Sequence, residues 1–482
     1  MFLATLLLLL PFFLFVSRSF FRMHRKQLPP GPNQWQVLSY LSELMHKPHF
    51  KLGNQLMVVA SSPDYAKEFC RTHDGIFSGR HLPAVYHYLQ GTIGSSIVLS
   101  PDCGKSWKLL RSICQNCVFS SRVVESSAWM RKTKAKEILD HLRGKDGEVV
   151  NLEDLMFATL ANMISSVLTS RDLFVINGGA AKGDNYEVMM DIVNEVIEGT
   201  TAPGLVDFLP ILKGVDFWSK GKAKDICRKI KLTWGDIIQE RKSFGRENPS
   251  SNRDFLDTVL SDTTFSDDQI GNALMEILIG ATDTTTITSV WLMVELIKNP
   301  EMLSKVRDEI SQAFKGDELN ESLLSNNCNY FQACIKETLR LHVPAPLLVP
   351  HRATEACKVN NYTIPKNSMV LVNAWGIARD PSYWEDAPIF KPERFLESKI
   401  GHRGTHFEYL PFGTGLRMCP GSTVAFKNIQ ILVGSLLHYF DWSLPNGEDI
   451  SSIDTNEKYI TTLKKEKPLL LVSRIREQNV VG

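Results

Sequence analysis

Residues 412–421 read FGTGLRMCPG, a glycine-rich turn with a single cysteine, Cys419, near its end. Apolar residues recur with helical spacing directly after the turn and predict a helix over residues 422–439. Cys419 would then lie at the N-terminus of that helix, where the helix dipole stabilises a negative charge. The glycines allow the backbone to approach a flat ligand closely. The pattern therefore predicts a thiolate that binds a metal ion, with a structural cysteine in a buried turn as the alternative.

The spacing of this turn, F-x-x-G-x-R-x-C-x-G, resembles the haem loop of the cytochrome P450 family at every fixed position. The resemblance covers nearly the whole chain and implies the fold of that family, mainly α with a small β part. It also implies haem b as the cofactor, with Cys419 as the thiolate ligand of the iron, a ligand that favours O–O cleavage. Phe412 is expected to pack on the sulfur side of the haem, and Arg417 to pair with a haem propionate.

Two further motifs imply a charge cluster behind the haem. Glu337 and Arg340 form an E-x-x-R pair on one face of a helix predicted over residues 329–342. By itself such a pair is common on protein surfaces. Residues 392–395 read PERF, and in the resembled family the arginine of this motif, here Arg394, joins the E-x-x-R pair in a buried cluster. The resemblance therefore gives these three residues a structural role.

A long helix is predicted over residues 267–299 and ends before Pro300. Midway along it, residues 280–285 read GATDTT, which is similar to the family's oxygen-activating motif. The resemblance implies that Asp283 and Thr284 are catalytic and deliver protons, since dioxygen activation requires an acid and a hydroxyl close to the metal. Without the haem loop, a threonine-rich stretch in a core helix would be the simpler interpretation.

Other residues are expected to hold the haem propionates. Trp107 and Arg111 match the W-x-x-x-R pattern of the family. His351 follows the E-x-x-R helix, where family members often place a propionate-binding histidine or arginine; a solvated surface position is the alternative. The predicted cofactor site thus consists of Trp107, Arg111, His351, Phe412, Arg417 and Cys419.

The N-terminus predicts a membrane anchor. Residues 1–21 are almost wholly apolar and long enough to cross a bilayer. Residues 22–34 form a basic and proline-rich hinge, and residues 35–482 would be the haem-thiolate catalytic domain. Because the cationic residues follow the apolar run, the catalytic domain is expected on the cytosolic side, with a cleaved secretory signal as the alternative. The resemblance to plant microsomal members implies the endoplasmic reticulum membrane.

The composition argues against several other classes. Lys plus Arg total 54 and Asp plus Glu total 53, so no basic excess predicts binding to nucleic acid. The nine cysteines are scattered without zinc spacing. The sequence has no convincing phosphate-binding glycine motif and no flavin or nicotinamide fingerprint. Electrons are therefore expected from another protein, and the resemblance implies an NADPH-dependent haemoprotein reductase.

The predicted function is that of a haem-thiolate monooxygenase that uses O₂ to hydroxylate a small, apolar specialised metabolite. Residues 372–381, VNAWGIARDP, are similar to plant microsomal members of alkaloid or terpenoid metabolism. The alternative is a haem-thiolate phenol-coupling oxidase or an isomerase that inserts no oxygen. Retention of Asp283 and Thr284 favours the monooxygenase, because members that rearrange peroxides need no proton relay.

The strand pattern leads to two expectations about the sheets. Residues 358–364 and 368–372 are predicted to pair as a hairpin around a turn at 365–367. After Phe50 the chain lacks a segment that plant relatives carry. Residues 56–60 are therefore expected to lose their hairpin partner and to present an exposed edge.

Overall fold

A computed structural model of the chain describes residues 49–52, 55–89, 96–176, 184–201, 205–208, 216–245, 253–262, 264–314, 320–459 and 462–476. The predicted anchor at residues 1–21 and hinge at residues 22–34 lie outside these residues, as does the start of the predicted catalytic domain.

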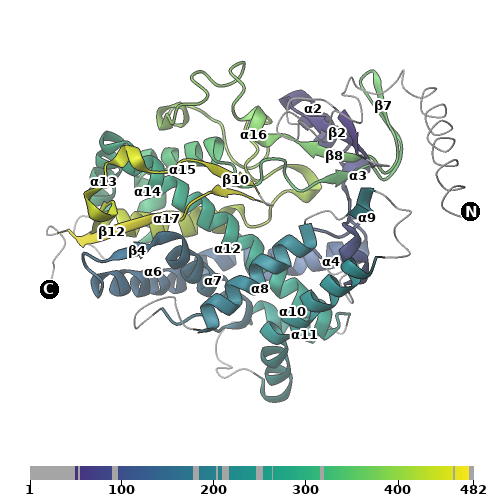
Figure 1. The fold of residues 1–482 in the computed structure, drawn as a ribbon, viewed down its shortest axis with the longest axis horizontal. Helices are drawn as coiled ribbons and strands as arrows, with labels where there is room; N and C mark the ends of the chain where they lie inside the picture. Colours follow the sequence, from purple (N-terminus) through teal and green to yellow (C-terminus); the bar gives the residue numbers. More distant parts are fainter. Residues whose placement is uncertain are drawn as a thin grey trace, which may run out of the picture.

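The long helix α12 (Asp267–Lys298) runs through the middle of the helical part of the molecule (Figure 1). It begins with a capping box, in which Ser266 Oγ accepts from the Gln269 N–H and Gln269 Oε1 accepts from the Ser266 N–H. By length and composition α12 could span a membrane, but 72% of its most apolar 18-residue window is buried inside the protein. It is therefore a core helix, and it packs along α7 (Leu152–Thr169).

The remaining helices surround α12 or connect the sheets. The longer ones are α4 (Lys105–Cys114), α6 (Ala128–Arg143), α8 (Asp184–Thr201), α10 (Phe217–Phe244), α13 (Pro300–Phe314), α15 (Asn329–Leu341) and α17 (Ser422–Tyr439). The shorter ones are α2 (Pro63–Lys67), α3 (Asp74–Phe77), α5 (Ser121–Ser126), α9 (Leu205–Phe208), α11 (Phe255–Ser261), α14 (Glu321–Asn327) and α16 (Ala374–Ile377).

The strands form small sheets beside the helices. The largest has five strands in the order β1 (His49–Leu52), β2 (Gln55–Ala60), β8 (Met369–Val372), β5 (His351–Arg352) and β3 (Gly79–Arg80). The others are β4 (Val149–Asn151), β12 (Leu470–Ile475) and β9 (Phe440–Ser443), then β10 (Glu457–Tyr459) with β11 (Leu463–Lys465), and β6 (Cys357–Val359) with β7 (Tyr362–Ile364). The expectation of a mainly α fold with a small β part is confirmed.

The predicted hairpin between residues 358–364 and 368–372 is wrong. Strand β6 pairs with β7, and the chain turns at Asn360, whose φ of 51° lies in the left-handed region that asparagine tolerates. Strand β8 instead pairs parallel with β2 and antiparallel with β5. All four residues of β8 are buried, which suits an inner strand of a sheet rather than one arm of an exposed hairpin.

The expectation that residues 56–60 lack a hairpin partner is also wrong. Strand β1 pairs antiparallel with β2, with Leu52 opposite Gln55. The two intervening residues, Gly53 and Asn54, are of types that favour tight hairpin turns. The other edge of β2 is covered by β8, so both edges of β2 are paired.

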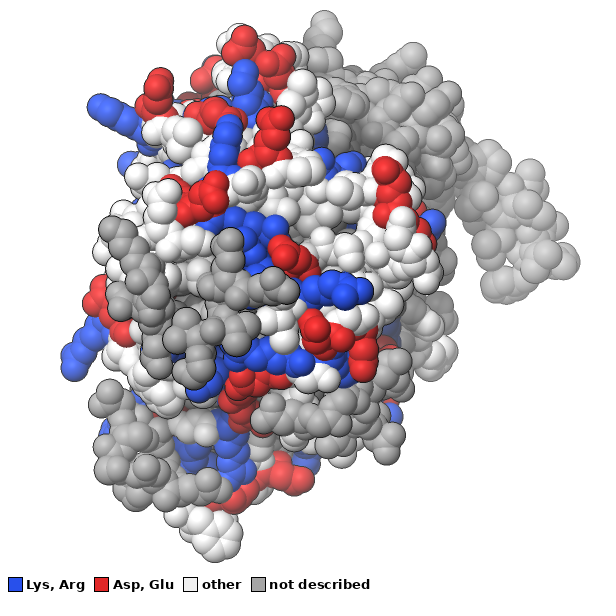
Figure 2. All heavy atoms as spheres, turned by 90° about the vertical axis from the view of Figure 1, so that its left-hand side faces the viewer, with Lys and Arg blue, Asp and Glu red and all other residues white. Residues whose placement is uncertain are grey.

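Charged side chains are mixed in sign on the face of the molecule drawn in Figure 2. Where described residues form this face, Lys and Arg lie next to Asp and Glu without a broad patch of one sign. The described part of this face therefore carries no field of one sign that would steer a strongly charged partner.

Candidate active site

The glycine-rich turn folds as its sequence predicts. The Cys419 N–H donates to the Phe412 carbonyl at 3.0 Å, which closes the loop, and α17 begins at Ser422. Gly413 and Gly415 have φ values of 66° and 75°, in the left-handed region that favours glycine. A side chain at Gly421 would approach the Phe119 ring at 3.3 Å and Cys419 Sγ at 3.9 Å. The loop thus holds Cys419 at the start of α17 by contacts that need these glycines.

Replacing Gly415 by Ala is expected to destabilise this loop strongly. The new Cβ would lie 2.2 Å from the Cys70 carbonyl oxygen and 2.5 Å from Asp74 Oδ2, which accepts from the Leu416 N–H. The left-handed backbone alone costs about 1–2 kcal/mol for a residue with a Cβ. We expect a larger fall in the thermal unfolding midpoint than this cost explains.

Gly447→Ala is the matched control, because Gly447 has a φ of 71° and nothing within 4 Å of its added Cβ. Differential scanning calorimetry of both variants separates the clash from the backbone cost. Equal losses in the two variants would show that the contacts of Gly415 do not matter.

The Cys419 thiol is accessible although its surroundings are those of the protein interior. Its side chain is exposed, yet burial raises the pKa of the thiol, while the Gly421 N–H and the charge of Arg111 act to lower it. The helix-terminal stabilisation predicted from the sequence is thus present through the Gly421 N–H, but burial outweighs it. A thiol in this setting is suited to lose its proton to a metal ion, since a coordinating thiol is deprotonated.

Trp107, Arg111 and Arg417 come together beside this loop. The indole Nε1–H of Trp107 donates to the Ile97 carbonyl at 2.9 Å, so this donor is already engaged. The guanidinium carbons of Arg417 and Arg111 lie 4.8 and 5.9 Å from the centre of the Trp107 ring. Trp107 therefore acts as an apolar support for the two cations.

Backbone carbonyls fix the orientation of both arginines. Arg417 donates to the carbonyls of Ser78 (3.0 Å), Ile97 (3.1 Å) and Ser100 (2.6 Å). Arg111 Nη2 donates to the Met418 carbonyl at 2.5 Å. Each guanidinium has five N–H donors in a fixed plane, so both retain N–H groups for a further acceptor.

His351 and a third cation, Arg80, complete this group. His351 is 5% exposed, so it does not occupy a solvated surface position, and its Nδ1 lies 2.8 Å from the Phe77 carbonyl. Burial, followed by the charge of Arg80, lowers the pKa of His351 to about 3. Burial and the charge of Arg417 lower the pKa of Arg80 to about 9. Nothing in the sequence around Arg80 singled it out beforehand.

This cation group fits the propionates of haem. Arg80 is buried, Arg111 and Arg417 are half-buried, and burial lowers the pKa of each. The charge of Arg417 also lowers the pKa of Arg80, and that of Arg111 lowers the pKa of Arg417, so two carboxylates beside these cations would be favourable in addition to the nearby Glu276. Together with the accessible Cys419 thiol, the donor set suits an iron porphyrin. Contact of individual side chains with the haem stays a prediction.

Helix α12 carries the predicted oxygen-activating motif. Gly280 is exposed in the middle of this buried helix, and an added Cβ would meet nothing within 4 Å. The Thr284 hydroxyl donates to the Gly280 carbonyl at 2.8 Å, and Thr285 bonds the Ala281 carbonyl in the same way at 2.7 Å. Asp283 instead accepts from the Thr462 hydroxyl at 2.8 Å. The two predicted catalytic side chains therefore have different partners.

Glu276, one turn before Gly280, is a residue that the sequence patterns did not single out. Its carboxylate accepts from Ser96 Oγ at 2.6 Å and from the N–H groups of Ile97 and Val98 at 2.8 and 2.9 Å. Because the Ile97 carbonyl accepts from Trp107 and Arg417, Glu276 fixes the segment that orients both. A charged residue within an otherwise apolar helical run was the available signal.

The three predicted structural residues meet behind the site. Glu337 and Arg340 are both 0% exposed and joined by two bonds of 2.8 Å. Glu337 Oε1 also accepts from Arg394 Nε at 3.0 Å and from the Lys391 N–H at 2.9 Å. Arg340 Nη1 donates to the Ala378 carbonyl at 2.7 Å. The cluster thus ties α15 to two later segments of the chain.

The fold and this site define a haem-thiolate oxidoreductase, and the family comparison agrees. The Cytochrome P450 family model matches residues 17–472, and the chain belongs to that family. It is accordingly a cytochrome P450 monooxygenase that binds haem b and uses O₂, a small organic substrate and a redox partner for electron transfer.

Similar proteins include hydroxylases named for (S)-N-methylcoclaurine and for geraniol. A probable (S)-N-methylcoclaurine 3'-hydroxylase isozyme 2 of Coptis japonica is 38% identical over 94% of this chain and 95% of that protein. Geraniol 8-hydroxylase of Catharanthus roseus is 32% identical over 97% and 98%. Corytuberine synthase of Coptis japonica is 36% identical over 94% and 95%. A zebra fish cytochrome P450 solved with progesterone shares the fold, with a TM-score of 0.73 and 21% identity over 92% of this chain and all of that one.

Proposed function

We propose that this enzyme hydroxylates a small, largely apolar alkaloid or terpenoid. The observation that carries the proposal is the 38% identity, over 94% of the chain, to an N-methylcoclaurine hydroxylase. The retained Asp283 and Thr284 support oxygen insertion, because this chemistry consumes protons at the metal. A benzylisoquinoline such as (S)-N-methylcoclaurine is the first compound to test.

Each predicted site residue has a task in this reaction. Bound haem supplies the oxidising chemistry and the electron sink. Cys419 would hold the haem iron through its thiolate, a ligand that favours O–O cleavage. Arg111, Arg417 and His351 orient the propionates, Trp107 supports the arginines, and Phe412 packs beside the sulfur. Asp283 holds a proton, and the Thr284 hydroxyl passes it on for dioxygen activation.

The redox partner is proposed to be an NADPH-dependent haemoprotein reductase in the same membrane. The sequence has no flavin or nicotinamide motif of its own, so another protein has to deliver the electrons. Residues 1–21 would anchor the enzyme in the endoplasmic reticulum membrane, with the following cationic residues on the cytosolic side.

Labelled dioxygen tests this function. Full-length enzyme is reconstituted with a plant NADPH-dependent reductase and supplied with (S)-N-methylcoclaurine under ¹⁸O₂. We expect a hydroxylated product that carries one labelled oxygen atom, detected by mass spectrometry. A product oxidised without the label would contradict hydroxylation and favour phenol coupling; a reaction without reductase is the control.

A further inference from the structure

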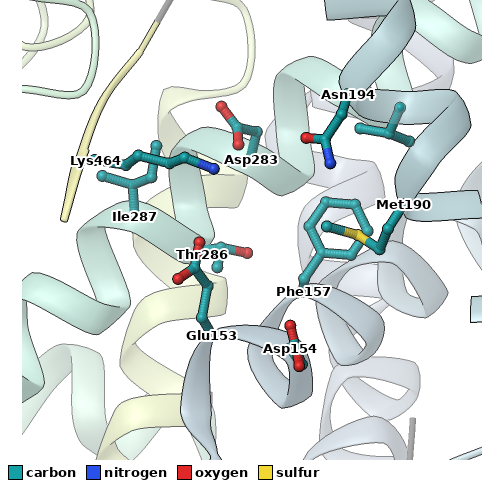
Figure 3. A pocket seen from close by; sticks show the side chains of 10 residues that line it. Glu153, Asp154, Phe157, Met190, Asn194, Asp283, Thr286, Ile287 and Lys464 are labelled. Carbon is teal, nitrogen blue, oxygen red and sulfur yellow. The ribbon is translucent and has the colours of Figure 1, made fainter. Parts of the chain in front are cut away.

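A small pocket with a mixed polar and apolar lining lies beside Asp283, and residues of α7, α8, α12 and β11 line it (Figure 3). Figure 3 shows Glu153 on α7, Asn194 on α8 and Lys464 on β11 around the Asp283 and Thr286 side chains of α12. Asp154, Phe157, Met190, Val193 and Ile287 complete the lining. Asn194 is exposed, so the lining reaches the molecular surface. The pocket thus joins Asp283 to solvent across a wall of titratable and hydroxyl groups.

The pocket is built to hold water. About 20 Å³ is open to the centre of a water molecule, and one water needs roughly 10–15 Å³ on this measure. Thr286 is 3% exposed, and its hydroxyl oxygen has no hydrogen-bond partner among the residues that the structure describes. A buried hydroxyl is normally hydrogen-bonded, so a water in the pocket is the partner that the site requires.

Asp283 faces this pocket, and the neighbouring Thr284 does not line it. The Thr462 hydroxyl donates to Asp283 Oδ2 at 2.8 Å, and Lys464 contributes a nearby positive charge. Thr284 instead bonds the Gly280 carbonyl beside the exposed part of α12. Asp283 therefore lines the pocket while Thr284, the next residue, bonds within the helix, so a proton reaching Thr284 from this pocket would pass Asp283.

Glu153 is the acid at the other end of the pocket. Burial raises the pKa of Glu153, and the charge of Lys464 acts in the opposite direction. Burial likewise raises the pKa of Asp283. Both carboxylates line the pocket, so a water held there can exchange protons with either of them.

We propose that this pocket is the port through which solvent protons reach Asp283, with Glu153 as the entry acid. A proton leaves the Glu153 carboxyl for the pocket water as that water gives another to the Asp283 carboxylate; Glu153 then regains a proton from bulk water. One O–H bond forms for each that breaks, and no oxidant is needed. Thr286 and Thr462 are positioning residues for the water and for Asp283. The inference rests on the proposed proton-delivery role of Asp283.

A crystal structure of the haem-bound enzyme provides a test that is independent of activity. We expect an ordered water within hydrogen-bond distance of Thr286 Oγ1 and of the Asp283 carboxylate. A dry pocket, or one filled by the Met190 or Lys464 side chain, would overturn the proposal.

Kinetics with Glu153→Gln test the entry acid. NADPH oxidation by the enzyme reconstituted with reductase is measured in H₂O and in D₂O, with and without (S)-N-methylcoclaurine. A positioned acid contributes about 10²–10⁴-fold when it acts directly; because Glu153 acts through water, we expect roughly a three- to tenfold slower rate and a larger solvent isotope effect. Glu148→Gln removes a charge from an exposed residue just before β4 and should match the wild type.

Two substitutions of Thr462 distinguish a role in proton transfer from a purely structural role. Thr462→Val keeps the shape and removes the hydroxyl, whereas Thr462→Ser restores a hydroxyl. We expect slow oxidation with a raised isotope effect only in the valine variant, at unchanged haem content. The proposal would be overturned if Glu153→Gln oxidised NADPH with the wild-type rate and isotope effect. It would also be overturned if the variant were slow but its isotope effect were unchanged.

The substrate proposal can fail separately. If wild-type enzyme consumes NADPH but leaves (S)-N-methylcoclaurine unchanged, only the proposed substrate is wrong. The solvent isotope effects on NADPH oxidation measured without substrate still test whether protons enter through the pocket. If the wild type shows no thiolate-ligated haem, both proposals fall.

Discussion

Cys419→Ala is expected to abolish monooxygenase activity completely. The thiol at this position is accessible, lies at the start of α17 and is flanked by the Gly421 N–H and the charge of Arg111. Alanine offers no donor atom for iron and no thiolate to favour O–O cleavage. The carbon monoxide difference spectrum of the reduced protein should therefore lack the Soret band of a thiolate-ligated haem.

Cys357→Ala is the matched control for this experiment. Cys357 is a buried thiol on β6, in a sheet that contains only β6 and β7. Its loss should leave the spectrum and the turnover unchanged. Full turnover in Cys419→Ala, or an imidazole-ligated haem in the wild type, would contradict the assignment of Cys419.

Glu337→Ala is expected to prevent the accumulation of soluble, haem-containing enzyme. The substitution would leave the guanidinium groups of Arg340 and Arg394 without their shared carboxylate, and Arg340 is 0% exposed. Breaking a buried ion pair by removing one partner costs about 3–5 kcal/mol. This cost is a large fraction of the roughly 5–15 kcal/mol that stabilises a typical folded protein. Haem content per protein and recovery of soluble protein measure the effect.

Lys391→Met serves as the control because it removes a nearby charge from the surface. The Lys391 amine lies 3.4 Å from Asp386, and its side chain is 41% exposed. Such a surface ion pair contributes about 0–1 kcal/mol to the free energy of unfolding. The hydrogen bond from the Lys391 backbone N–H to Glu337 remains in this variant. A stable Glu337→Ala protein with normal haem content would refute the structural role of the cluster.

The sequence by itself determined the parts of the protein that depend on neighbouring residues. The turn at 412–421, the start of α17 at Ser422 and the extent of α12 follow from glycine positions, capping residues and apolar periodicity, which act over a few residues. The fixed spacing around Cys419 was specific enough to indicate the family. The pairing of Glu337, Arg340 and Arg394 was predicted through the resemblance and is present in the structure.

Only the tertiary structure decided which distant segments meet. Strand β8 pairs with β2 because a fully buried strand needs partners on both edges, which hairpin signals in the local sequence do not encode. Arg80 lies close enough to Arg417 to feel its charge, although more than three hundred residues separate them in the sequence. The Thr462 hydroxyl likewise donates to Asp283, which lies 179 residues earlier in the chain. Such contacts depend on how whole helices and strands pack, so neither the place of Arg80 among the predicted arginines nor the pocket beside Asp283 could be located from sequence spacing.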